Sequence, residues 1–188
     1  MLNGLEYSVM TSSLRNFIQS HVEIKKLRTH SSLEAGKSVL ELGCGSGHGT
    51  LLIKKHFAPN SIRAIDIDGR MVRRAKRLHS DLHFSFEEAD ATDLPYGTAE
   101  FDAVFDFAMI HTIPNWKDCV EEIKRVLKPG GELIIEDLSI ESFTNKLGKL
   151  GRKYLNNPYE TMYKKDDFIA YLKKLGFSVV HEESYAIA

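Results

Sequence analysis

One loop of the chain carries glycine at every second position, directly after the apolar run 38–42 and directly before the apolar stretch 51–53. These glycines are Gly43, Gly45, Gly47 and Gly49. A strand that ends in such a loop lets a ligand lie against bare backbone, and the start of the following helix adds free amide donors. The sequence therefore predicts a strand, a ligand-binding loop and a helix, in this order.

The spacing of the glycines argues against two common nucleotide sites. A dinucleotide site requires G-x-G-x-x-G, but the last position is His48 when counted from Gly43 and Thr50 when counted from Gly45. The Gly-Lys-Ser at residues 36–38 lacks the leading glycine of an NTP-binding loop and precedes the strand. The glycine spacing thus argues against a dinucleotide site and against an NTP-binding loop.

Glu41 lies near the end of the predicted strand, directly before the glycine loop. An acid at this place suits a ligand that carries positive charge. S-adenosylmethionine has an ammonium group and a sulfonium group and no phosphate, so it fits this requirement.

Four later segments extend the pattern. They are a strand that ends in acids (62–68), an acid-rich segment (87–96), a further strand (101–107) and a helix end with a Pro-Gly-Gly turn (125–133). Their order and spacing resemble the class I S-adenosylmethionine-dependent methyltransferases, in particular the small-molecule branch that includes the quinone-biosynthesis C-methyltransferases. The resemblance covers residues 37–138, with a weaker continuation to the end of the chain.

The resemblance implies roles for particular residues outside the loop. Asp66 matches the acid that accepts the ribose hydroxyls, Asp68 is a nearby alternative, and Ile67 between them also belongs to the cofactor site. Asp90 matches the acid that accepts the adenine amino group, and the amide of Ala91 meets the ring. Taken singly, Asp66 and Asp90 are equally consistent with ordinary strand-end or helix-capping acids.

Within the loop, the resemblance assigns the cofactor to Glu41, Gly43, Cys44, Gly45 and Gly47. Asp106, at the end of the strand 101–107, faces the methionine part of the cofactor in the same interpretation. Small polar residues are common at this place in the family, so Asp106 followed by Phe107 makes the acceptor side unusual.

Methyl transfer is an in-line displacement, and orienting the nucleophile can supply roughly 7–11 kcal/mol of the barrier. A base is needed only if the acceptor keeps its proton. Asp106 and His111 are the candidate catalytic groups, since histidine accepts a proton near neutral pH. A purely structural role for His111 is equally consistent with the sequence.

Strands and helices alternate along the chain, which indicates an α/β fold. We expect a Rossmann-like, doubly wound, mostly parallel sheet with helices on both faces. The expected strands are 38–42, 62–66, 82–87, 101–107 and 132–138, and the expected helices are 8–29, 48–57, 69–79, 116–128 and 166–175, the last capped by Asp166 and ended by Gly176. Only residues 184–188 follow the segment 177–183, so we expect the family's seventh, antiparallel strand to be missing or truncated.

We expect one methyltransferase domain over 1–188, with an N-terminal helical cap (1–30), a cofactor-binding core (37–138) and a substrate lid (139–165). The apolar residues of 143–154 share one helical face with basic residues around it. Packing on the domain, a lid over the acceptor and a peripheral membrane contact all remain open for this stretch. In a lid, aromatic residues would bind an organic acceptor, namely Tyr154, Tyr159 and Tyr163. Basic residues would bind an acidic acceptor, namely Lys146, Lys149, Arg152 and Lys153.

The composition limits the partners. A net charge of −1 gives no general attraction to nucleic acid, and no motif of the nucleic-acid methylases follows the strand 101–107. Cys44 and Cys119 form neither a CxxC pair nor a zinc site, which fits a reducing cytoplasm, and no leader or membrane span is evident. We therefore expect a cytoplasmic enzyme with a small-molecule acceptor, no metal and an unspecified oligomeric state.

Two alternatives remain open. One is a protein or RNA methyltransferase that docks through the basic helix 69–79. The other is a protein that binds S-adenosylmethionine without catalysis, as a regulator or partner.

Overall fold

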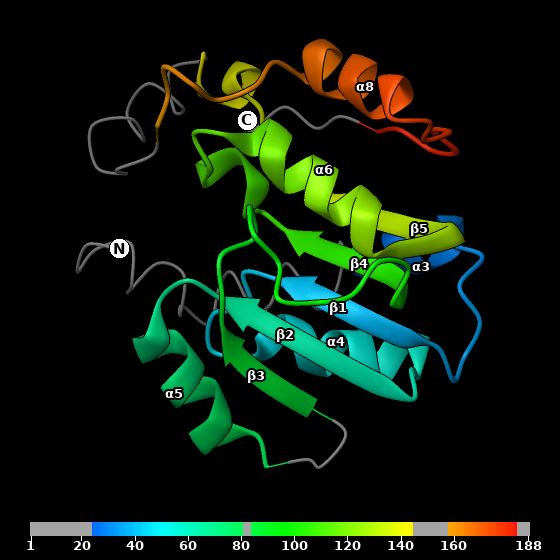
Figure 1. The fold of residues 1–188 in the computed structure, drawn as a ribbon, viewed down its shortest axis with the longest axis vertical. Helices are drawn as coiled ribbons and strands as arrows, with labels where there is room; N and C mark the ends of the chain where they lie inside the picture. Colours follow the sequence, from blue (N-terminus) through cyan, green and yellow to red (C-terminus); the bar gives the residue numbers. More distant parts are fainter. Residues whose placement is uncertain (1–23, 81–83, 145–157, 184–188) are drawn as a thin grey trace.

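The computed structural model describes residues 24–80, 84–144 and 158–183. In this part of the chain five parallel strands form one sheet in the order β3-β2-β1-β4-β5 (Figure 1). The strands are β1 (Ser38–Leu42), β2 (Ser61–Asp66), β3 (Phe84–Glu88), β4 (Phe101–Phe107) and β5 (Leu127–Glu136).

The chain order reverses between β1 and β4, because β2 and β3 extend the sheet to one side and β4 and β5 to the other. In open parallel sheets, ligands bind beyond the carboxyl ends of the strands at such a switch point. The glycine loop follows β1 directly, so the topology places it at this position.

Helices cover both faces of the sheet (Figure 1). The described α-helices are α3 (Ile24–His30), α4 (His48–Phe57), α5 (Gly69–Leu78), α6 (Trp116–Val126) and α8 (Lys165–Lys174), with 3-10 helices η2 (Ile110–Thr112) and η3 (Ile140–Phe143).

The buried apolar side chains of the described residues fall into two clusters, one on each face of the sheet. The first joins the sheet to α6 and α8, and the second joins it to α3, α4 and α5. Within β1, Leu40 and Leu42 belong to the first cluster and Val39 belongs to the second. Strands that are buried on both faces read as continuous apolar runs, which explains the sequence of β1.

The doubly wound parallel sheet expected from the sequence is confirmed, with corrections at the ends of elements. The strand expected at 132–138 starts at Leu127, because the Pro-Gly-Gly turn lies inside β5 next to β4. The strand expected at 82–87 is described as Phe84–Glu88. Of the helix expected at 8–29, the described part is Ile24–His30.

The last helix begins one residue earlier than expected. Lys164 occupies the N-cap position of α8 without a side-chain hydrogen bond, so the prediction that Asp166 is the cap was wrong. Asp166 instead lies in the first turn, where a negative charge still interacts favourably with the helix dipole.

Residues 177–183 adopt no strand, and residues 184–188 lie outside the described part of the chain. In the described ranges, β5 is therefore the edge of the sheet on this side. No described helix has the length and apolar character needed to cross a bilayer.

Candidate functional site

The glycine loop after β1 has an open side. Gly45 has φ +54, and a Cβ added there would meet no atom within 4 Å. Gly43 has φ +66, and its Cβ would lie 2.4 Å from Cγ of Met109. Glycine is therefore required at Gly43 by packing and by backbone conformation, whereas at Gly45 the free space itself is available to a ligand.

Asp66 holds this loop in place from the end of β2. Its carboxylate accepts hydrogen bonds from the amides of Gly45 and Asp68, each at 2.8 Å, and the Cys44 amide donates to the Ile65 carbonyl at 2.8 Å. Burial raises the pKa of Asp66. Each carboxylate oxygen has further lone pairs, so these bonds leave room for ribose hydroxyls.

Asp68, the alternative ribose acid, is engaged elsewhere. Its side chain accepts from the backbone amide of Arg70 at 2.9 Å, as the N-cap of α5, and pairs with the Arg70 guanidinium at 2.5 Å. The hydrogen bond from Arg70 lowers the pKa of Asp68 to about 2. Ile67, between the two acids, is 67% exposed and presents apolar surface beside the loop.

Glu41 lies beneath the loop and is only 2% exposed. The Thr50 hydroxyl of α4 donates a hydrogen bond to its carboxyl group. Gly49 makes room for this contact, because a Cβ there would lie 2.2 Å from Glu41 Oε1. Burial raises the pKa of Glu41 to about 8. Glu41 is thus a buried acid that joins β1 to α4, and its assignment to the cofactor site stays a prediction.

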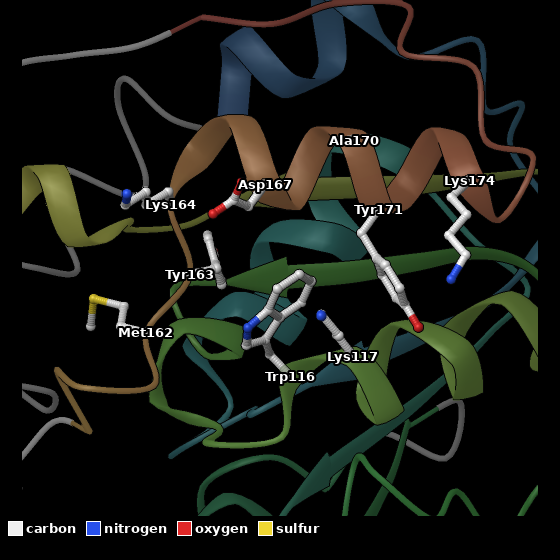
Figure 2. A pocket seen from close by; sticks show the side chains of 9 residues that line it. All are labelled: Trp116, Lys117, Met162, Tyr163, Lys164, Asp167, Ala170, Tyr171 and Lys174. Atoms are coloured by element: carbon white, nitrogen blue, oxygen red, sulfur yellow. The ribbon is translucent and has the colours of Figure 1, made fainter.

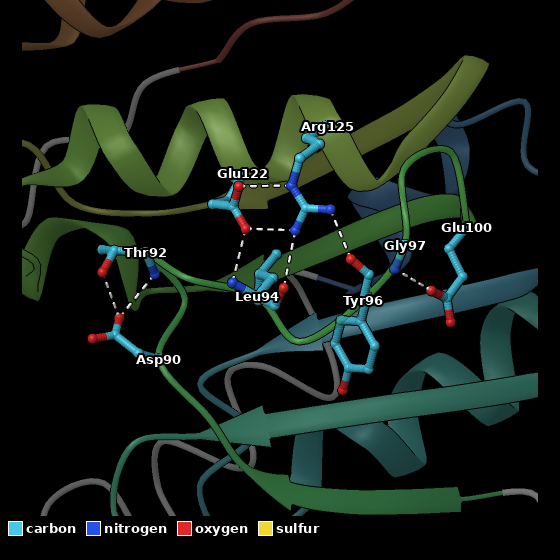
Figure 3. A network of polar contacts seen from close by, with 8 residues as sticks. All are labelled: Asp90, Thr92, Leu94, Tyr96, Gly97, Glu100, Glu122 and Arg125. Carbon is cyan, nitrogen blue, oxygen red and sulfur yellow. Dashed lines mark hydrogen bonds and ion pairs between the residues drawn. The ribbon is translucent and has the colours of Figure 1, made fainter.

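Asp90 is exposed at the start of the segment between β3 and β4. Its Oδ1 accepts from the amide and the hydroxyl of Thr92, both at 2.8 Å, and its other oxygen points away from this turn (Figure 3). The next residue, Ala91, is buried. The assignment of Asp90 and Ala91 to adenine binding stays a prediction.

Two charged side chains of α6 hold the same segment against the domain (Figure 3). The Arg125 guanidinium donates to the carbonyls of Tyr96 at 2.7 Å and Leu94 at 2.9 Å, and pairs with Glu122 at 2.6 Å. Glu122 accepts from the Leu94 amide at 2.8 Å. The mutual hydrogen bonds raise the pKa of Arg125 and lower that of Glu122. Sequence reasoning missed this network, whose only signal was the (i, i+3) spacing of the two charges.

Asp106, at the end of β4, is completely buried. Its Oδ1 accepts from the Met109 amide at 3.0 Å, and its Oδ2 has no hydrogen-bond partner among the described residues. Burial, and next the charge of Asp137, raise the pKa of Asp106 well above its usual value. The raised pKa favours the neutral acid, and the role of Asp106 as a base stays a prediction.

His111 in η2 is 5% exposed and bonded to Asp137, the first residue after β5. Its ring nitrogen Nδ1 lies 2.5 Å from Asp137 Oδ1, and its backbone amide donates to Oδ2 at 2.8 Å. The Tyr163 hydroxyl donates to the same carboxylate at 2.6 Å. No local pattern indicates Asp137 as a site residue, because only the fold brings residues 111, 137 and 163 together.

A cavity of about 470 Å³ lies between α6 and α8 (Figure 2). Small-molecule sites commonly measure about 300–1,000 Å³. Its lining is aromatic and basic: Trp116, Lys117, Met162, Tyr163, Lys164, Asp167, Ala170, Tyr171 and Lys174. Tyr163 thus belongs both to the wall of this cavity and to the group around Asp137.

The predicted lid is described only at its two ends. Phe143 is buried and packs edge-on against Tyr159, with ring centroids 5.1 Å apart, and Tyr163 is buried in the core under α8. The rest of the proposed basic and apolar face lies outside the described residues, namely Lys146, Leu147, Lys149, Leu150, Arg152, Lys153 and Tyr154. The lid and the membrane contact through 143–154 stay predictions.

Residues 40–135 match the family model described as a methyltransferase domain. This match covers just over half of the chain and runs from β1 to β5. The chain belongs to this family. Its fold and family are those of the class I S-adenosylmethionine-dependent methyltransferases, and its cofactor is S-adenosylmethionine.

Two curated relatives of this methyltransferase domain have lipid-related names. A fatty-acid O-methyltransferase of Mycolicibacterium smegmatis is 34% identical over 102 residues, which are 54% of this chain and 37% of the relative. A probable phthiotriol/phenolphthiotriol dimycocerosates methyltransferase of Mycobacterium ulcerans is 34% identical over 104 residues, covering 55% and 40%. The matches span well under half of these relatives.

Among solved structures, an S-adenosylmethionine-dependent methyltransferase from Aquifex aeolicus superposes with a TM-score of 0.72. The two sequences are 20% identical, and the superposition covers 94% of this chain and 89% of that one. At this level of identity the likeness establishes the fold of the methyltransferase domain. The quinone-biosynthesis branch suggested by the sequence stays a prediction.

Proposed function

We propose that the chain transfers a methyl group from S-adenosylmethionine to a small-molecule acceptor by in-line displacement. The observation that carries the proposal is the junction of Gly45 and Asp66. An open glycine loop and a strand-end acid lie bonded together at the switch point of a methyltransferase fold.

The residues around this junction suit the cofactor in charge and shape. The backbone of Gly43, Cys44, Gly45 and Gly47 would lie along the methionine part, and Asp66 would accept the ribose hydroxyls. Ile67 would lose its exposed apolar surface to the adenine ring, which is favourable at about 25 cal/mol per Å² buried.

Two further sites complete the proposed cofactor contacts. Asp90 and Ala91 would meet the adenine edge, and Asp106 would face the amino-acid part. The unpartnered Oδ2 of Asp106 supports this, because a buried polar atom without a partner costs free energy that a ligand donor would remove. When bound, S-adenosylmethionine supplies an electrophilic methyl group, and the chain orients the acceptor behind it.

For the acceptor, we infer a molecule with an apolar body and a polar or acidic end. The names of the two relatives refer to lipids, and the cavity between α6 and α8 combines aromatic rings with three lysines. Lys117 lies 5.6 Å from the Trp116 ring centroid and 5.4 Å from that of Tyr171, so positive charge and apolar surface are adjacent. A lipid-like small molecule matches this lining.

The alternatives have less support. A protein or RNA methyltransferase docking through α5 is not favoured by the relatives, and Arg70 of that helix is paired with Asp68. A non-catalytic binder would share the cofactor site and differ only in turnover. A cytoplasmic location remains part of the proposal, supported by the free thiols of Cys44 and Cys119.

The test is a transfer assay with methyl-labelled S-adenosylmethionine and three acceptor classes: long-chain fatty acids, hydroxylated lipids and quinols. We expect labelled product with at least one class, together with S-adenosylhomocysteine in equal amount. Intact cofactor binding without transfer to any class would favour the non-catalytic binder. Salt-sensitive binding to polyanions with transfer to RNA or protein would favour the macromolecular alternative.

A further inference from the structure

The Asp137 carboxylate accepts four hydrogen bonds from three residues. His111 contributes its ring Nδ1 at 2.5 Å and its backbone amide at 2.8 Å, the Leu138 amide donates at 2.8 Å, and the Tyr163 hydroxyl donates at 2.6 Å. Oδ1 and Oδ2 each take part in two of these bonds. Four donors on one carboxyl group match the acceptor capacity of its ionised form.

Asp106 and Asp137 have unequal hydrogen-bond surroundings. Asp137 has four donors, whereas Asp106 accepts from the Met109 amide through Oδ1 and its Oδ2 has no described partner. Burial, and next the charge of Asp137, raise the pKa of Asp106. Four donors favour the charged form of Asp137, whereas Asp106 lacks such a set of donors.

The geometry fixes which nitrogen of the His111 ring carries the proton. Because the Asp137 carboxyl group already accepts from three other donors, a hydrogen on Nδ1 fills its fourth acceptor site, and Nε2 then keeps its lone pair. The backbone amide of His111 binds the same carboxylate, so ring and main chain are held by one group. The ring is nearly buried and therefore has little freedom to rotate.

Tyr163 links this arrangement to the cavity between α6 and α8. Its hydroxyl binds Asp137, while its ring stacks on Phe168 at 4.4 Å and meets Trp116 edge-on at 5.4 Å. Trp116 and Tyr163 both line the cavity (Figure 2). An acceptor in this cavity would lie against Tyr163, whose hydroxyl binds the Asp137 carboxyl group, which in turn binds His111.

We propose that His111 is the general base of the methyl transfer, that Asp137 is its positioning residue, and that the acceptor binds as a protonated hydroxyl compound. The acceptor O–H bond breaks and its proton goes to Nε2, while an oxygen lone pair forms the bond to the methyl carbon. The electron pair of the broken carbon–sulfur bond stays on sulfur. The products are a methyl ether, S-adenosylhomocysteine and an imidazolium that releases its proton to water.

This proposal deepens the proposed function and rests on it, since it selects hydroxyl acceptors over carboxylates, which need no base. The ionisable groups around His111 come from four elements. They are Asp106 of β4, Glu136 and Asp137 at the end of β5, Cys119 of α6 and Tyr163 before α8. Burial raises the pKa of Cys119 and of Tyr163, so these two groups stay neutral around pH 7.

The first test needs no turnover. Nitrogen-15 NMR of the histidine rings, with His111 assigned through His111→Gln, should show Nδ1 protonated and Nε2 unprotonated at pH 7.5. In Asp137→Asn the amide would donate to Nδ1, so the proton should move to Nε2. Proton on Nε2 in the wild-type protein would overturn the role of Asp137.

The second test measures transfer to a hydroxylated lipid across pH. Asp137→Asn should lower kcat on the order of 10²–10⁴-fold while KM and S-adenosylhomocysteine affinity change little. Asp137→Glu should restore part of kcat, and Asp118→Asn, an exposed acid of α6, is the matched control. Circular dichroism establishes whether each variant is folded. If Asp137→Asn does not fold, the NMR measurement on the wild-type protein still tests the role of Asp137.

Three outcomes distinguish between the positioning role of Asp137, the role of His111 as the base and the proposed methyl transfer itself. Unchanged kcat and an unchanged pH profile in folded Asp137→Asn would overturn the positioning role. Preference for fatty acids over hydroxyl compounds, with no loss in His111→Gln, would overturn the base while leaving methyl transfer intact. Wild-type protein that binds S-adenosylhomocysteine but transfers to no acceptor would overturn both the proposed function and the base.

Discussion

The Asp66 carboxylate accepts a hydrogen bond from the Gly45 amide at 2.8 Å, which joins the end of β2 to the glycine loop after β1. The acid and the loop are 21 residues apart in the chain, yet they form one wall of the switch point. A cofactor that lies along the loop would thus meet Asp66 without any rearrangement of the backbone.

Replacing Asp66 with alanine should weaken S-adenosylhomocysteine binding by about 1.5–3 kcal/mol, because a charged hydrogen-bond acceptor is lost. Calorimetric titration measures the change, and a thermal melt shows that the variant is folded. Asp68→Asn is the control, since asparagine can still cap α5 and the affinity should remain near wild type. The reverse ranking of these two variants would move the ribose role to Asp68.

Gly45→Ala should abolish most cofactor binding, because its methyl group would occupy the open side of the loop. Gly36→Ala is a matched control: Gly36 also has positive φ, +80, and free space around its Cβ position, but it precedes β1. Both variants should lose about 1–2 kcal/mol of stability from the left-handed backbone. Equal affinity for S-adenosylhomocysteine in the two variants would argue against binding at the loop.

Glu41→Gln should change how stability depends on pH. The folded pKa of Glu41 is raised from 4.5 to about 8, so between these values the folded state binds a proton that the unfolded state lacks. This contribution makes stability fall as pH rises through that window, by up to about 1.4 kcal/mol per pH unit. Urea unfolding at pH 5 and pH 8 should therefore show a smaller decrease for Glu41→Gln than for wild type. Identical decreases would mean that Glu41 is ionised in the folded protein.

Arg125→Lys should weaken the attachment of the segment that follows Asp90 to α6. Lysine keeps the charge, but its ammonium group cannot reproduce the fork that binds Glu122 and the carbonyls of Leu94 and Tyr96. We expect several-fold weaker S-adenosylhomocysteine binding and a lower melting temperature. Arg73→Lys, on the exposed side of α5, should match the wild type in both measurements.

The sheet could be predicted from the sequence because β1 and β4 are short, largely apolar segments and several strands end in an acid or are followed by a glycine. The glycine loop and the position of Asp66 at a strand end follow from the same local signals, whereas the cofactor roles of Asp66 and Asp90 come from the resemblance and stay predictions. Element ends depended on pairing instead: β5 extends back to Leu127 because it pairs with β4 from Phe101 onward, which no local pattern reveals. The cap of α8 was also misplaced, since Asp166 has the chemistry of a cap but lies two residues after the N-cap position, which Lys164 occupies.

The acceptor side was the least predictable part of the site. Asp137 and Tyr163 are separated by 26 residues, and only the packing of α8 over the end of β5 brings the hydroxyl to the carboxylate. The pKa values also depend on tertiary burial: Glu41 and Asp106 appear as ordinary acids in the sequence, and their surroundings raise the pKa of both.

The central claim is that the glycine loop and Asp66 bind S-adenosylmethionine rather than a phosphate-bearing nucleotide. Calorimetry at pH 7.5 with S-adenosylhomocysteine, NAD and ATP, in wild type and in Asp66→Ala, tests it most directly. The structure predicts binding of S-adenosylhomocysteine at a single site, weakened in Asp66→Ala, and no heat of binding for NAD or ATP. Tight binding of NAD with no response to S-adenosylhomocysteine would contradict the account.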